Sequence, residues 1–361
     1  MNFPKLIRQT QGPLDPTVAK ARVAVRRMLE PVLRGKTEPL VLVACSGGPD
    51  SLALAATAAF VVPRMGGRAG AVIVDHSLQE GSAQAASGAG RECEELGLTP
   101  VRVVTTTVES GPGSGGIEAA ARSARYGSLR AQAEELNAAA ILLGHTLDDQ
   151  AEQVLLALAR GSGTRSIAGI PDQRDMFYRP FLNLRRSETV HICTHLNLNA
   201  WLDPTNEVPH DRRGQEATSL IDIPRRTIVR DVLLPALEDH LGPGISEALA
   251  RTAQLARDDD DALSDLAHSL LNDATVETND EGRQLDCKKL RNAHRAIRTR
   301  ALHLACLSLG VPSGALARVH IAALDELLTN WHGQGPVDLP GGHRGRRQYG
   351  TLNLYRYETT T

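Results

Sequence analysis

The chain has 361 residues, of which 42% are hydrophobic and 23% charged, and its formal net charge is −2. This length exceeds one ordinary core and predicts two domains. The nearly balanced charge excludes a uniformly basic surface for nucleic acid, so any RNA partner must be held by local basic patches.

Cysteine content and hydropathy limit the cellular compartment. The five cysteines form no Cys-x-x-Cys pair, which argues against a disulfide framework and a cysteine-built metal centre. We therefore expect a reducing, cytoplasmic compartment. The first ten residues lack the apolar segment of a signal peptide. The longest strongly apolar stretch, residues 52–62, is shorter than the about 18 residues that a membrane helix needs, so we expect no membrane association.

Strand and helix signals alternate through the first part of the chain, after an amphipathic helix expected at residues 16–34. Short apolar or β-branched runs predict strands, and Ala-rich segments between them predict helices. Strands are expected at 40–44, 71–74, 101–107 and 140–143, and helices at 51–62, 82–96, 117–137 and 147–160. This alternation predicts the α/β class with a doubly wound parallel sheet.

The pattern changes after about residue 165, where prolines punctuate shorter pieces. Residues 208–222 are polar, Gly-containing and acidic, which predicts a surface insertion or mobile loop. Residues 245 to about 330 read as helical almost throughout, and residues 333–361 turn to Gly-rich turns and β-type runs. We therefore expect one domain at 1–244 and a mainly helical C-terminal domain with a short β tail at 245–361.

A glycine-rich run, Ser46-Gly47-Gly48-Pro49-Asp50-Ser51, joins the first expected strand to a helix. Successive glycines let backbone N–H groups form a nest for phosphate oxygens, and the helix start adds its positive dipole end. The two serine hydroxyls can donate to the same anion. Asp50 fits such a site if a divalent cation, most naturally Mg²⁺, lies between it and the phosphates. A plain capped turn is the alternative, but strand, nest, acid and helix together favour phosphate binding.

A Walker loop is excluded by its spacing. Gly35-Lys36-Thr37 would end such a loop, but Glu30 stands at the first glycine position and no strand precedes it. A loop without lysine, built as a pyrophosphate nest, suits cleavage of ATP between its α- and β-phosphates. The chain is therefore expected to convert ATP to AMP and pyrophosphate.

Three further clusters follow expected strands, at the sheet edge where doubly wound folds bind ligands. They are residues 74–78 (Val-Asp-His-Ser-Leu), residues 118–126 and residues 144–152. In the third, Thr146 and Asp149 have the spacing of a capping box, which gives them a structural role. Capping does not account for His145, and His145 with Asp149 could hold a metal and move a proton.

Two pairs of basic side chains at helical spacing have structural alternatives. Arg122 and Arg125 lie three residues apart on one helical face, either as a solvated stripe or as an anion clamp on the α-phosphate. His191 and His195 stand at i and i+4 and could bind a metal. Because no third ligand is evident, we interpret these histidines as ordinary helix residues.

Together these motifs resemble the N-type ATP pyrophosphatases and, within them, the tRNA(Ile)-lysidine synthetases. The resemblance covers about residues 40 to 240. Its stretches are VACSGGPDSLAL, VDHSL, EAAARSARY, LLGHTLDDQAEQVLLALARGSG, Arg179-Pro180-Phe181-Leu182, Trp201-Leu202-Asp203-Pro204-Thr205-Asn206 and Arg226-Thr227-Ile228-Val229-Arg230. The segment between the last two is longer and richer in glycine and acids than is usual in this family.

The resemblance implies a reaction and its substrates. In this family, ATP adenylates the wobble cytidine of the isoleucine tRNA with a CAU anticodon, and free L-lysine displaces AMP to give lysidine. The cofactors implied are ATP and Mg²⁺, and the resemblance is compatible with a homodimer.

The resemblance also implies roles for individual residues. The loop at residues 46–51, with His76, would bind the nucleotide, and Asp50 and Asp149 would coordinate Mg²⁺. Arg125 would steady the phosphate, as would Arg122. His145 would orient the adenylated base or accept a proton from lysine. Arg122, Asn206, Arg226 and Arg230 would contact tRNA or lysine.

The C-terminal part resembles the family more loosely, through Leu-Pro-Gly-Gly and Tyr-Gly-x-Leu between residues 334 and 355. Two basic stretches there could contact the tRNA backbone or be solvated helix faces. They are Lys288, Lys289, Arg291, Arg295, Arg298 and Arg300, and then Arg344, Arg346 and Arg347.

Two alternative functions are open. The first is another AMP-forming enzyme, but a thiolation enzyme usually needs a Cys-x-x-Cys pair or a sulfur carrier, and no glutaminase domain is visible for an amide synthetase. The second is a catalytically silent tRNA-binding protein, which would predict loss of Asp50, His145 and Asp149, yet all three are present.

Overall fold

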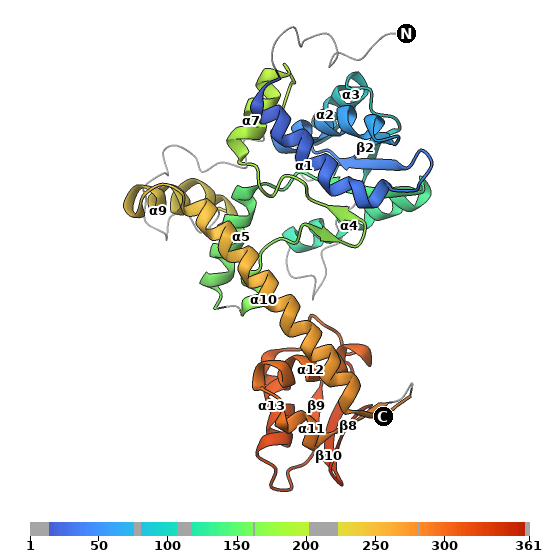
Figure 1. The fold of residues 1–361 in the computed structure, drawn as a ribbon, viewed down its shortest axis with the longest axis vertical. Coiled ribbons are helices and arrows are strands. Elements are labelled where there is room, and N and C mark those ends of the chain that lie inside the picture. Colours follow the sequence, from blue (N-terminus) through green and yellow to red (C-terminus); the bar gives the residue numbers. More distant parts are fainter. Residues whose placement is uncertain are drawn as a thin grey trace. The chain divides into compact units, whose positions relative to one another are not determined.

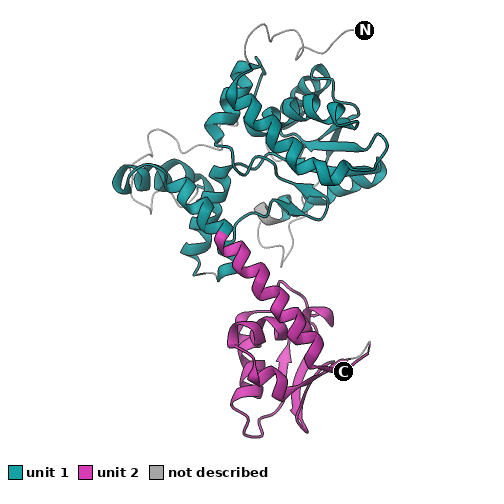
Figure 2. Cartoon of the chain, in the orientation of Figure 1, with its two compact units in different colours: residues 1–254 teal, residues 255–361 magenta. Residues whose placement is uncertain are grey.

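The computed structural model describes residues 14–75, 81–106, 117–161, 163–201, 223–279 and 282–357, with side chains in the third range from residue 120 onward. The chain divides into two compact units, residues 1–254 and 255–361, which are described separately (Figure 2). The predictions for His76, Asn206 and the loop at 208–222 lie outside the described residues.

The first unit is built on a six-stranded sheet with the order β3-β2-β1-β4-β6-β5 (Figure 1). All neighbouring pairs are parallel except β5 and β6. The strands are β1 (Leu40–Ala44), β2 (Arg68–Asp75), β3 (Val101–Thr105), β4 (Ala138–Leu143), β5 (Gln173–Arg174) and β6 (Phe177–Tyr178). Every residue of β1 is buried, as expected for a strand covered on both faces. The predicted doubly wound α/β fold is confirmed.

Helices cover both faces of this sheet. They are α1 (Pro16–Leu33), α2 (Pro49–Arg64), α3 (Ser82–Glu95), α4 (Ile117–Glu135) and α7 (Arg186–His195). The helix α5 (Leu147–Ala159) follows β4 and belongs to another group of helices. Alternate residues of β1 enter two different cores. Val41 and Val43 join the core with α1, α2, α3 and α7, whereas Leu40 and Leu42 join the core that contains Leu129 of α4.

A second group of helices in this unit packs around α5. Three consecutive helical segments, α8 (Arg225–Ile228), the π-helical η5 (Val229–Leu233) and α9 (Leu234–Leu241), bury Val229 and Leu234 against Ala151. A short helix, α6 (Thr164–Ile167), follows α5. The long helix α10 (Ile245–Ala274) begins at the expected domain boundary, and the division between the compact units falls within it.

The second unit packs helices against an antiparallel sheet with the order β7-β8-β11-β10-β9. Its elements are β7 (Thr275–Thr278), β8 (Gly282–Asp286), α11 (Cys287–Asn292), α12 (Arg295–Ser308), α13 (Arg318–Thr329), β9 (Val337–Leu339), β10 (His343–Gln348) and β11 (Thr351–Arg356). The expectation of nearly continuous helix from 245 to 330 is wrong at β7 and β8. β8 pairs with β11, which follows much later in the chain, and β7 pairs with β8. Local patterns do not reveal the long-range pairing on which this hairpin is built.

Among the described residues, no helix combines the length and hydrophobicity needed to span a lipid bilayer. All five cysteines are buried and free, so no disulfide links these elements.

Candidate active site

The glycine-rich loop turns sharply between β1 and α2. Cys45 N–H donates to Val72 O at 3.0 Å, which extends the β1–β2 pairing to the start of the loop. Gly47 then adopts a φ of +83°, and a Cβ at this position would lie 3.1 Å from Cβ of Ala89. Positive φ and close packing both favour glycine here. The loop ends at Pro49, the first residue of α2.

The two serines of this loop bond to each other and to its backbone. Ser51 Oγ accepts from Ser46 N–H at 3.1 Å and donates to Gly48 O at 3.0 Å. Ser46 Oγ lies 3.2 Å from Ser51 Oγ. Ser51 is buried whereas Ser46 is exposed. Ser51 therefore holds the loop in shape, and Ser46 is the serine whose hydroxyl a ligand can reach.

The third cluster predicted from the sequence, residues 144–152, contacts the first turn of α2 at its glycine, Gly144. A Cβ on Gly144 would lie 3.0 Å from backbone atoms of Asp50 and Ser51. Only a glycine lets the chain after β4 approach this helix start so closely. The sequence predicted that both motifs follow strands at one sheet edge, and the structure brings them into contact.

Asp50 lies in the first turn of α2, and both of its carboxylate oxygens accept hydrogen bonds from α7. Oδ1 accepts from Thr189 Oγ1, and Oδ2 accepts from Arg186 Nε at 3.3 Å. Burial raises the pKa of Asp50, while Arg186 and the Thr189 hydroxyl oppose that shift. Arg186 thus favours the ionised form of this side chain.

Asp149 serves both as a helix cap and as part of the site. Its Oδ2 accepts from Thr146 N–H at 2.7 Å and from Thr146 Oγ1 at 3.0 Å, which forms the predicted capping box. Its Oδ1 accepts from Arg226 at 2.9 Å and from Arg186 at 3.3 Å. Burial acts to raise the pKa of Asp149, but Arg226 and Arg186 outweigh it and the pKa is lowered.

Arg186 is central to this arrangement and was missed by sequence reasoning. Its Nε bonds to Asp50, its Nη2 to Asp149 and its Nη1 to Glu152, each at 3.3 Å. Burial opposes its charge, but the carboxylates outweigh burial and raise its pKa. Arg186 is the first residue of α7. A cation at a helix N-terminus is electrostatically unfavourable unless a carboxylate pairs with it, so its position could have indicated an acidic partner.

Glu152 is fully buried and accepts hydrogen bonds from three arginines. Besides Arg186, Arg226 Nε donates to it at 2.6 Å and Arg230 Nε at 2.7 Å. A buried carboxylate is tolerated only with such pairing. No role for Glu152 was predicted from the sequence, although it lies three residues after Asp149 on the same helical face. Asp50, Asp149, Glu152, Arg186, Arg226 and Arg230 are called the carboxylate cluster below.

His145 and Arg179 carry the orphaned polar atoms of the site. Within the described part of the chain, His145 Nδ1 and Arg179 Nε are the buried side-chain nitrogens without a hydrogen-bond partner. Burial lowers the pKa of His145 to about 3; Arg179 and Arg125 act in the same direction, against Asp149. His145 is therefore neutral at pH 7. A buried unpaired nitrogen costs stability unless a ligand completes it.

Arg125 and Arg122 differ although they share a helix. Arg122 is exposed, with its guanidinium 5.3 Å from the ring centroid of Tyr126. Arg125 is partly buried, and burial and Arg122 lower its pKa. Its charge acts on both Cys45 and His145, and within the described residues it makes no ion pair. The clamp hypothesis therefore suits Arg125 better than Arg122.

The donor set of Asp50 and Asp149 fits a hard divalent cation. Both carboxylates contact the guanidinium of Arg186, so they converge on one cationic group. Carboxylate oxygens are the ligands that Mg²⁺ prefers.

Comparisons with known proteins agree with this site. Residues 20–215 match the PP-loop domain family, and residues 285–352 match the TilS substrate binding domain family. The chain is 49% identical to the tRNA(Ile)-lysidine synthase of Thermobifida fusca and 44% identical to that of Streptomyces coelicolor, each match covering 94% of this chain and 98% of the relative. The U34-tRNA thiolase of Methanococcus maripaludis, at 20% identity, shares the fold with a TM-score of 0.51 over 67% of this chain and 80% of its own.

The fold and its phosphate loop define an ATP-using enzyme of the PP-loop class. Because the matches to its relatives extend over nearly the full length of both chains, the family can be stated more narrowly. The chain belongs to the tRNA(Ile)-lysidine synthase family.

Proposed function

We propose that this protein ligates free L-lysine to the wobble cytidine of the isoleucine tRNA with a CAU anticodon, in the cytoplasm. The base oxygen attacks the α-phosphate of ATP and pyrophosphate leaves. The neutral lysine amine then attacks the carbon that carries this oxygen, and AMP leaves with the oxygen. The observation that carries the proposal is the contact between the phosphate loop and the carboxylate cluster at one sheet edge, in a chain of this family.

The phosphate loop is proposed to bind the pyrophosphate part of ATP. Gly47 and Gly48 supply backbone N–H groups, and Ser46 supplies an exposed hydroxyl. Pro49 has no N–H and starts the helix whose dipole favours the anion. Ser51 keeps the loop in shape through Gly48 O.

Asp50 and Asp149 are proposed to hold Mg²⁺, which when bound would neutralise phosphate charge. Arg186 contacts both carboxylates and favours their ionised form. We infer that it keeps the two side chains charged and oriented before the nucleotide arrives, which makes it a positioning residue.

Arg125 is proposed to contact the α-phosphate, where negative charge builds during attack. A partly buried guanidinium that makes no ion pair with the described residues is suited to pair with an anion. Arg122 is exposed and would contribute longer-range attraction only.

His145 is proposed to orient the base or the attacking amine by accepting a hydrogen bond. A group with a pKa of about 3 is a weak proton acceptor at pH 7, but its neutral ring has an acceptor nitrogen. The unpaired Nδ1 supports the orienting role over that of general base.

Arg226 and Arg230 are proposed to act first as positioning residues. Both donate to Glu152, and Arg226 also holds Asp149. To contact tRNA or lysine, these side chains would have to bind the substrate in addition to, or in place of, Glu152 and Asp149. That role stays a prediction, as does the one for Asn206.

The C-terminal unit is proposed to contact tRNA through only some of its basic side chains. Arg298 is buried against Asp325, and Lys289, Arg300 and Arg344 are paired with aspartates. Arg347 donates to the carbonyl oxygen of Leu327. Among the other exposed members, Lys288, Arg291 and Arg346 make no ion pair with described residues, and Arg295 reaches Asp325 only at 4.0 Å. These four are the candidates for contact with phosphates.

The proposed reaction is tested by AMP release with Mg-ATP, labelled lysine and an unmodified transcript of the tRNA. We expect AMP release and label transfer to need all three substrates. Cleavage of ATP with tRNA but without label transfer would indicate another nucleophile. No cleavage at all would favour the silent tRNA-binding protein. Sedimentation of the same preparation tests the homodimer.

A further inference from the structure

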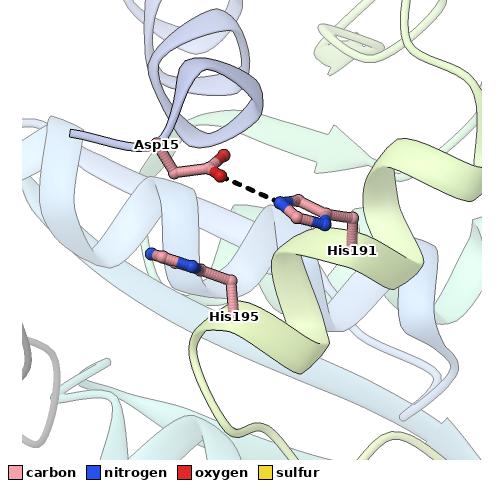
Figure 3. A group of neighbouring side chains, drawn as sticks. All are labelled: Asp15, His191 and His195. Carbon is pink, nitrogen blue, oxygen red and sulfur yellow. Dashed lines mark hydrogen bonds and ion pairs between the residues drawn. The ribbon is translucent and has the colours of Figure 1, made fainter. Parts of the chain in front are cut away.

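Two histidines of α7 lie beside an aspartate at the start of α1, and none of the three belongs to the carboxylate cluster. In the sequence, His191 and His195 lacked a third ligand. The fold supplies one in Asp15, which is 176 residues from His191 along the chain. Figure 3 shows both imidazole rings on the side of α7 that faces Asp15.

The geometry of this group suits a metal ion. His191 Nε2 lies 2.9 Å from Asp15 Oδ2, and one ligand atom from each of the three residues lies within 4.8 Å of the others. The two rings are nearly parallel, at 21°, with centroids 6.1 Å apart. Ligands at about 2.1 Å from a tetrahedral ion are about 3.4 Å apart. Small side-chain rotations of the exposed histidines would therefore close the site.

Asp15 has one oxygen available for a metal. Its Oδ1 accepts from the N–H groups of Thr17 and Val18 and caps α1, which leaves Oδ2 as the oxygen that meets His191. The hydrogen bonds from His191 and from Val18 N–H lower the pKa of Asp15 to about 2. The carboxylate is anionic at neutral pH, so it offers charge as well as an oxygen ligand.

A simple hydrogen-bonded pair accounts for only part of this arrangement. It would need His191 and Asp15, but it gives no reason for His195 to lie one turn later on the same side of the helix. Two histidines at i and i+4 with a carboxylate are a donor set for a borderline transition metal, whereas Mg²⁺ prefers oxygen ligands only.

We propose that Asp15, His191 and His195 bind one divalent transition-metal ion, with Zn²⁺ as the best match and water completing its coordination. The ion ties the start of α1 to α7. The same two helices are also joined by the 2.8 Å ion pair between Lys20 and Glu188. The first turn of α7 carries Arg186, which bonds to Asp50. The ion therefore restrains α7, and through it the position of Arg186, but it takes no part in the chemistry.

Spectroscopy with Co²⁺ in place of Zn²⁺, in excess Mg²⁺, tests this site on the full-length protein. We expect one equivalent of Co²⁺ to give the absorption of a four-coordinate ion with nitrogen ligands, and Zn²⁺ to displace it. Loss of a residue that only supports a metal ligand typically lowers metal affinity by about 10- to 100-fold. His195→Ala removes a ligand itself, so it should lower the affinity for Co²⁺ by more than that. His268→Ala, which removes an exposed histidine of α10, is the matched control and should bind as wild type does.

Two further variants distinguish this site from the catalytic carboxylates and from a simple helix cap. Asp50→Asn should leave the Co²⁺ spectrum unchanged, because the catalytic carboxylates are not its ligands. Asp15→Asn keeps a good N-cap but should lose the rise in melting temperature that Zn²⁺ gives the wild type. The proposal is wrong if wild type binds no Co²⁺, if His195→Ala binds it unchanged, or if Asp50→Asn abolishes the signal.

Discussion

The two units of this molecule each bury opposite charges, and the comparison shows what distinguishes an active site from a structural ion pair. In the C-terminal unit, Arg298 contacts both oxygens of Asp325 and donates to Ala293 O at 2.8 Å. Donors and acceptors there are matched between two adjacent helices. Such a pair fixes the packing of α12 on α13 and has no unsatisfied donor that would call for a ligand.

The carboxylate cluster of the first unit is built differently. Its members come from α2, α5, α7, α8 and η5, and Arg186 divides its donors among three carboxylates. Beside it, His145 Nδ1 is left without a partner. Buried charge alone therefore does not identify a site. The site is identified because buried charges converge beside a phosphate loop and a buried polar atom there lacks a partner.

The largest effect is expected from Asp50→Ala. Removing this carboxylate should lower AMP formation by at least about 10³-fold, because one proposed metal ligand and the partner of Arg186 are both removed. The melting temperature and tRNA affinity should stay near wild type, as judged by circular dichroism and filter binding. Retained turnover would remove Asp50 from the mechanism.

A pair of truncations compares the two charge clusters directly. Glu152→Ala removes an acceptor from three partly buried arginines, and Asp325→Ala removes the carboxylate that pairs with the buried Arg298. Each change should lower the free energy of unfolding, by about 3–5 kcal/mol for Asp325→Ala and by no more than that for Glu152→Ala. Only Glu152→Ala should also reduce kcat for AMP formation, assayed at saturating tRNA below both melting temperatures. Equal kcat values for the two variants would show that the carboxylate cluster is merely structural.

A change in pH dependence is expected from Arg186→Gln. Burial raises the pKa of Asp50 and Arg186 opposes that shift, so removing the guanidinium should raise this pKa further. Activity needs the ionised carboxylate, and therefore the acidic limb of the pH–rate profile should move to higher pH. Arg186→Lys, which keeps the charge, should move it less. Superimposable profiles for wild type and Arg186→Gln would contradict this assignment.

The smallest effect is expected from charge reversal on α11. Lys288→Glu with Arg291→Glu should weaken tRNA binding. The slope of log affinity against log salt concentration should become shallower by about one unit for each phosphate that is no longer bound. ATP affinity should not change. Arg26→Glu with Arg27→Glu on α1 is a control of equal charge change on exposed residues. If both double variants bind tRNA alike, α11 is a solvated helix face.

Local patterns accounted for much of the fold and for part of the site. The β1 run, the glycine loop and the capping box of Thr146 are set by neighbours a few residues apart, so their geometry follows from the sequence. The pairing of Arg186 with Asp50 joins residues 136 apart, and no local pattern encodes it. Asp15 with His191 and the β8–β11 pairing could not be predicted for the same reason.

The central claim is tested most directly by the mass of the wobble nucleoside. The CAU isoleucine tRNA would be incubated with ATP, lysine and wild type, Asp50→Ala or Asp325→Ala protein, and then digested for mass spectrometry. We expect cytidine bearing one lysine, with loss of one water, for wild type and Asp325→Ala but not for Asp50→Ala. Unmodified cytidine with wild type, or a cytidine adduct of another nucleophile, would contradict the proposed reaction.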